Sequence, residues 1–176
     1  MLTSSTARIW VFLGLTVALT SIFWALVIAT GHNAGGRGAY AVGSMWSPGV
    51  AALITCRVCK VNISSLGWGW GEWRHQRLAY LIPLAYAAVA YLVIWTAGLG
   101  GFPNQAFIAA TRESLGWPSA PGWLVTASWF IFLATTGVVR TVANTLGEEI
   151  GWRGFLAPEL TARLGFTGGA LLTGAI

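Results

Sequence analysis

The sequence predicts an all-α fold, a polytopic bundle of transmembrane helices that forms a single membrane domain over residues 1–176. Of these residues 56% are hydrophobic and only 9% are charged, whereas a soluble domain has about 25% charged residues. The 11 tryptophans lie largely near the ends of apolar runs, as Trp10 and Trp117 do, where they would anchor helices at the membrane interface. A soluble protein would need a charged surface that this composition does not supply.

Apolar runs predict two spans in the first third of the chain. The first covers about residues 9–30, enough to cross a hydrocarbon core of about 30 Å. A cleaved signal peptide is the alternative, because Arg8 precedes the run and small residues follow it, but the apolar core of a signal peptide has about 7–15 residues. The second span covers about residues 44–60. Pro48 suits the start of its helix, because proline is tolerated in the first turn.

Two further spans are predicted at about residues 78–101 and 122–146. The loop at 102–121 contains one short amphipathic turn at 105–115, and residues 155–164 are amphipathic again. From about residue 164 an incomplete span begins, too short to cross a membrane. Because the sequence stops within this apolar run, we expect it to be truncated or to be a gene fragment.

The charge balance predicts orientation in the membrane and no nucleic-acid partner. The net charge is +5, but no Lys/Arg-rich arm or RNA-binding signature is present, so the partner of the basic residues is the lipid bilayer. The predicted outer side has Arg37 and Arg112. The predicted inner side has Arg8, Arg57, Lys60, Arg74 and Arg77. This bias places the N-terminus in the cytosol of a multi-pass protein of the plasma membrane.

The cysteines and histidines are too few and too far apart to predict a metal site. Cys56 and Cys59 form a Cys-x-x-Cys beside two cations, which would lower a thiol pKa, so a redox pair is one interpretation. A zinc site would need further ligands that are not nearby, and a structural role for both thiols is favoured. His32 and His75, the two histidines, are interpreted as interfacial polar residues.

The candidate site is a charged cluster at the end of the fourth predicted span, made of Glu148, Glu149 and Arg153. A charge at bilayer depth costs about 2.5–3.5 kcal/mol, so such clusters usually carry function. Glu149 and Arg153 are four residues apart, which predicts an ion pair on one helix face. Glu148 points about 100° away, free to act on water or to bind a metal.

The cluster also has plainer interpretations. The two glutamates would stabilise the start of an interfacial helix by their charge alone. If the ion pair lies in a poorly solvated place, we expect its loss from one side to cost about 3–5 kcal/mol. Arg140, within the fourth span, would snorkel to the interface or pair with a carboxylate.

Residues 148–156 (Glu-Glu-Ile-Gly-Trp-Arg-Gly-Phe-Leu) resemble the first motif, Glu-Glu-x-x-x-Arg, of the CPBP intramembrane proteases. This group includes type II CAAX prenyl endopeptidases and the Abi-like bacteriocin-processing or bacteriocin-immunity proteins. Residues 45–52 (Met-Trp-Ser-Pro-Gly-Val-Ala-Ala) are similar to the second-span opening of bacterial members. The resemblance implies a helical membrane hydrolase with a polar cavity open to the cytosol and a peptide or prenylated-protein substrate.

The resemblance also implies roles for the cluster. Glu148 would activate the hydrolytic water, Glu149 and Arg153 would shape the cavity, and two later motifs would each contribute a histidine. Family members are described both as metalloproteases and as glutamate-dependent proteases, so a divalent metal such as zinc is implied by resemblance only. No histidine follows Arg153, and the chain therefore holds half of such a site.

Three function classes remain open at this point. The first is an intramembrane endopeptidase of the CAAX protease type. The second is a non-catalytic membrane protein, an immunity or scaffold homologue or a degenerate fragment. The third is a small transporter with an intramembrane carboxylate.

Overall fold

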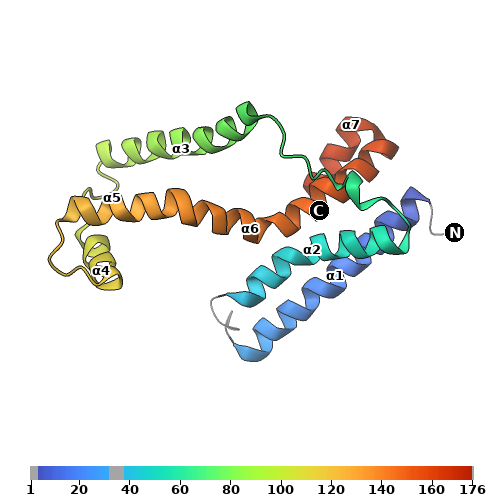
Figure 1. Cartoon of the computed structure of the whole chain (residues 1–176), viewed down its shortest axis with the longest axis horizontal. Helices are drawn as coiled ribbons and strands as arrows, with labels where there is room; N and C mark the ends of the chain where they lie inside the picture. The colour runs from blue at the N-terminus through green and yellow to red at the C-terminus, as the bar shows by residue number, and fades with distance from the viewer. Residues whose placement is uncertain (1–3, 32–37, 176) are drawn as a thin grey trace. The chain divides into compact units, whose positions relative to one another are not determined.

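The structure, a computed structural model, describes residues 4–31 and 38–175 (Figure 1). Within these ranges every regular element is a helix, which confirms the predicted all-α class. The α-helices are α1 (Ser5–Thr30), α2 (Ala39–Val58), α3 (Trp73–Thr96), α4 (Gln105–Leu115), α5 (Gly122–Phe132), α6 (Val138–Glu149) and α7 (Ala157–Ala175). Three shorter elements are the 3-10 helix η1 (Ile63–Leu66) and the π-helices η2 (Leu133–Gly137) and η3 (Ile150–Leu156).

Three helical stretches of the described chain are long and apolar enough to cross a membrane: Ser5–Thr30, Trp73–Thr96 and Gly122–Ala175. They identify a helical membrane protein, as the composition predicted. α2 begins at Ala39, before the predicted second span, so the prediction that Pro48 lies in the first turn is wrong and Pro48 lies inside the helix. α2 is not one of these stretches, so the count of four spans stays a prediction.

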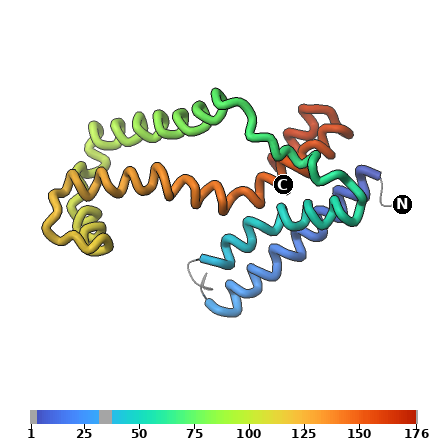
Figure 2. Tube along the Cα trace, in the orientation of Figure 1, coloured from blue at the N-terminus to red at the C-terminus, as the bar shows by residue number. Residues whose placement is uncertain are grey.

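The chain divides into two compact units, one made of residues 1–68 and 138–176 and the other of residues 69–137. In the first unit α1 and α2 run side by side, as the Cα trace shows (Figure 2). Ser4 caps α1, because its Oγ accepts a hydrogen bond from the N–H of Ala7 at 3.3 Å. Helix α2 also packs on α6 and η3. The small buried residues Ala51, Ala52 and Cys56 let these helices approach closely.

The second unit contains α3, α4, α5 and η2. The predicted third span is confirmed as a helix, but it begins five residues earlier and ends at Thr96. The amphipathic turn predicted at 105–115 is α4, capped by Asn104, whose Oδ1 accepts a hydrogen bond from the N–H of Phe107 at 3.0 Å. α4 packs on α5 and buries Ile108 and Thr111.

Candidate functional site

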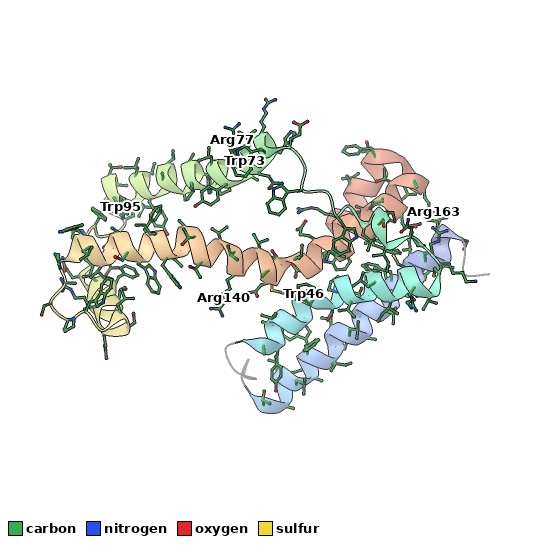
Figure 3. All side chains as sticks on the ribbon, viewed as in Figure 1. Trp46, Trp73, Arg77, Trp95, Arg140 and Arg163 are labelled. Carbon is green, nitrogen blue, oxygen red and sulfur yellow. The ribbon has the colours of Figure 1, made fainter. Side chains whose placement is uncertain are left out.

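The two glutamates of the cluster lie where α2 crosses the end of α6. At this crossing the backbones nearly touch, because a Cβ added to Gly49 would lie 2.7 Å from the carbonyl oxygen of Gly147. A Cβ added to Gly147 would in turn lie 2.5 Å from the Cα of Trp46. The indole Nε1 of Trp46 donates a hydrogen bond to the carbonyl oxygen of Ala143 at 3.1 Å, and Figure 3 shows this side chain between α2 and α6.

One turn further along, Gly151 makes the second close approach of this crossing. A Cβ there would lie 2.6 Å from the carbonyl carbon of Pro48. Gly147 and Gly151 thus form a small-xxx-small pattern, which lets two helices pack at backbone distance in a membrane. The spacing is visible in the sequence, but our sequence interpretation did not use it.

The apolar residues of the segment 148–156 face the interior of their unit. Phe12 of α1 contacts Trp152 edge-on, with the ring centroids 5.6 Å apart, and lies 5.0 Å from the ring of Phe155. Phe155 and Leu156 are buried. The ring contacts join η3 to α1, and η3 also packs on α2.

The predicted ion pair between Glu149 and Arg153 is confirmed, with Nη1 of the guanidinium bonded to Oε2 of the carboxylate. Other protein groups leave much of both side chains uncovered. The side chains are 47% exposed for Glu149 and 77% exposed for Arg153, because the apolar residues around them turn inward. Protein does not enclose either charge, so the larger cost of breaking the pair stays a prediction for a pair that lipid surrounds.

Glu148 has a different environment from its neighbour. It is half-buried and follows Gly147, the residue at the centre of the crossing. Within residues 4–31 and 38–175 its carboxylate has no hydrogen bond or ion pair. The adjacent glutamates are therefore divided as predicted, one bound to a cation and the other available.

A groove of about 540 Å³ begins at Glu149 and Arg153. Its floor is η3, and its far wall is the second half of α7, which turns back at Gly165 (φ 74°). The turn is tight, since a Cβ on Gly169 would lie 2.6 Å from Oγ1 of Thr161. The groove is lined by Glu149, Trp152, Arg153, Ala157, Thr161, Phe166, Ala170, Thr173 and Gly174. Glu148 is not among these residues.

Of the other residues singled out from the sequence, Arg140, Cys56 and Cys59 belong to the same unit as the cluster and do not join it. His75 lies in the second unit, at the start of α3, where its Nδ1 is 3.8 Å from Oε2 of Glu72. His32 lies outside the described residues. Arg140 projects from α6 with an exposed side chain (Figure 3), and no carboxylate of the described chain pairs with it. Cys56 and Cys59 are unbonded and buried, which argues against an accessible redox pair.

The described side chains do not form a metal site. Over this part of the chain no group of three or more His, Cys, Asp or Glu residues is placed to hold an ion. A zinc site needs at least three protein ligands, and Glu148 and Glu149 supply two.

No family model, curated protein or solved structure matches this chain. The fold and the position of the cluster are known from the structure alone. Any assignment of function therefore depends on the chemistry of the residues at the crossing.

A second ion pair, which the sequence did not predict, joins α1 and α7, which belong to the two chain segments of the first unit. Nη1 of Arg8 lies 3.0 Å from Oε1 of Glu159, and the hydroxyl of Ser5 donates to Oε2 of the same carboxylate at 2.5 Å. The side chains are only 28% exposed for Arg8 and 16% exposed for Glu159. The partners are 151 residues apart, beyond the reach of a helical spacing rule.

The two ion pairs provide a matched comparison of stability. Glu159→Gln removes the charge from a shielded pair with a further hydrogen bond, and we expect a loss of about 1–3 kcal/mol. Glu149→Gln makes the same change in an exposed i,i+4 pair, for which about 0.3–0.5 kcal/mol is expected. Thermal unfolding of both variants in one detergent measures the difference. An equal or larger loss for Glu149→Gln would show that its pair is shielded after all.

Proposed function

We propose that this chain contributes the carboxylate base of an intramembrane endopeptidase of the CPBP type, with Glu148 as that base. The observation that carries the proposal is the division between two adjacent glutamates. Glu149 is neutralised by Arg153, whereas Glu148 is half-buried and has no partner in the described chain. A base must be able to accept a proton, and an unpaired carboxylate can do so.

The proposed reaction is hydrolysis of a peptide bond close to the membrane. The Glu148 carboxylate takes a proton from water, the water oxygen attacks the carbonyl carbon, and the proton passes to the leaving nitrogen. The groove begins at Glu149, next to Glu148 in the chain, and its walls combine apolar residues with the charges of the ion pair. A peptide or a lipid-modified protein segment fits such a surface.

The packing of α2 against the helix that carries Glu148 also supports Glu148 as the base. The two segments that resemble the family, 45–52 and 148–156, are separated by almost a hundred residues in sequence but contact each other at Pro48 and Gly151. Gly147, which directly precedes the second segment, contacts the first at Gly49. A segment that presses on the glutamate-bearing helix would fix the position of Glu148. This arrangement suits a site whose base must be held in place.

A non-catalytic membrane protein, such as an immunity or scaffold homologue, is the second candidate. It is favoured by the composition of the unit that holds Glu148, whose described residues include no histidine. Without a second group to hold water or stabilise the oxyanion, a carboxylate alone loses orders of magnitude in rate.

Cleavage of a lipid-anchored, internally quenched peptide in proteoliposomes tests the two candidates. The assay compares residues 1–176 with the product of the whole open reading frame that contains them. We expect the open reading frame product to cleave the peptide and residues 1–176 alone to be inactive, because the described residues of the unit that holds Glu148 include no histidine. If neither protein cleaves, the non-catalytic candidate is favoured.

We further propose that the N-terminus lies in the cytosol, as the Arg/Lys bias predicts. Reporter fusions after Lys60 and after Arg112 should then report opposite sides of the membrane, with the first in the cytosol. A cytosolic signal from the fusion after Arg112 would contradict this orientation.

A further inference from the structure

The second unit contains an open pocket of about 640 Å³ that the proposed protease site does not use. It lies between α4, α5 and the turn at Phe102 that precedes α4. Its walls are mostly apolar and include Ile108, Trp123 and Phe130. Phe102 is held at the pocket by stacking on Trp95 of α3, with the ring centroids 4.6 Å apart, and Figure 3 shows Trp95 at the end of that helix.

One charged side chain, Arg112 of α4, lines this pocket. It is half-buried, and its Nε donates a hydrogen bond to the carbonyl oxygen of Ala120 at 2.8 Å. This bond fixes the plane of the guanidinium and leaves the Nη groups for another acceptor. In the described parts of the chain no carboxylate forms an ion pair with Arg112, and its neighbour Glu113 is exposed.

The helices that precede and follow the pocket in the chain point to a membrane interface as its place. α3 ends at Thr96 and the next apolar stretch begins at Gly122, and each is long and apolar enough to cross a membrane. A segment between two such helices remains at the surface where the chain leaves and re-enters the bilayer. α4, an amphipathic helix of 11 residues, is suited to this position.

We propose that this pocket binds an anionic phospholipid, with the headgroup phosphate on Arg112 and the upper part of one acyl chain along Ile108, Trp123 and Phe130. Arginine presents a planar fork of N–H donors that matches a phosphate. The volume falls within the range of about 300–1,000 Å³ of ligand sites. Trp123 is 72% exposed and Phe130 is 60% exposed, so an acyl chain can reach the apolar wall from the side.

The charge of the pocket selects among lipids. Arg112 is the one ionisable residue in the lining, and its charge of +1 complements an anionic headgroup. A zwitterionic headgroup adds a cation for which the lining offers no carboxylate. A free phosphate would satisfy Arg112 but would leave the apolar wall uncovered, which makes a lipid the better occupant.

Titration of the purified protein in detergent tests the proposal, with dihexanoyl phosphatidylglycerol, dihexanoyl phosphatidylcholine and inorganic phosphate as probes. We expect phosphatidylglycerol to bind about tenfold more tightly than phosphatidylcholine, because the choline cation of phosphatidylcholine offsets the attraction of its phosphate to Arg112. Inorganic phosphate should bind more weakly than either lipid. Equal affinity for the two lipids would overturn the assignment, and tight binding of inorganic phosphate alone would identify a plain anion site.

Three variants locate the site. Arg112→Gln should abolish the preference for phosphatidylglycerol, and Ala127→Phe, which fills the apolar part of the pocket, should weaken both lipids about equally. Ala127→Phe also keeps the test decisive if Arg112→Gln does not fold. Arg140→Gln removes an exposed charge elsewhere and should change neither affinity. If Arg140→Gln lowers the preference as much as Arg112→Gln does, the effect is general electrostatics and the pocket is not the site.

Discussion

Gly151→Ala is expected to destabilise the first unit by about 1–3 kcal/mol, the usual cost of overpacking a close contact. A Cβ at this position would lie 2.6 Å from the carbonyl carbon of Pro48 and 2.7 Å from its oxygen. These are backbone atoms, which cannot rotate away as the end of a flexible side chain can. The added methyl group must therefore push α2 away from η3.

Gly14→Ala is the matched control, because it makes the same change in the middle of α1. A Cβ there meets nothing within 4 Å, so the substitution should leave stability unchanged or raise it by about 0.5–1 kcal/mol through the better helix propensity of alanine. Thermal unfolding of the two variants in one detergent gives the comparison. If Gly151→Ala is as stable as Gly14→Ala, the helices do not cross at backbone distance.

Much of the fold follows from the periodicity of the sequence. Long apolar runs predicted α1, α2, α3 and the helical stretch that begins at Gly122. The amphipathic spacing at 105–115 predicted α4, because apolar residues that recur every three to four positions form one buried face of a helix. The spacing of Glu149 and Arg153 predicted their ion pair for the same reason. In each of these cases the pattern that carries the prediction lies within one continuous helical segment.

The features that were missed depend on contacts between helices or on departures from a regular helix. The π-helical turns η2 and η3 were not predicted, since a periodicity of 3.6 residues was assumed throughout. The pair of Arg8 and Glu159 joins helices that are far apart in sequence. The exposure of Arg153 depends on how Phe12 packs against η3, which no pattern within residues 148–156 contains.

The largest loss of cleavage rate is expected from substitution of Glu148. Removal of a general base typically lowers the rate by about 10²–10⁴-fold, so Glu148→Gln should be inactive in the open reading frame product that cleaves the peptide. Folding should hardly change, because the carboxylate of Glu148 has no partner in the described chain that the amide would lose. Glu149→Gln is the neighbouring control. Its carboxylate is bound by Arg153, and its loss should lower the rate only a few-fold.

The most direct measurement is kcat/KM for Glu148→Gln and Glu149→Gln in the same proteoliposome assay, with the unfolding temperature of each protein recorded beside it. The division between the two glutamates predicts a loss of about 10²-fold or more for Glu148→Gln, at an unfolding temperature close to that of the parent. The opposite result, an active Glu148→Gln and an inactive but folded Glu149→Gln, would show that the paired glutamate is the base.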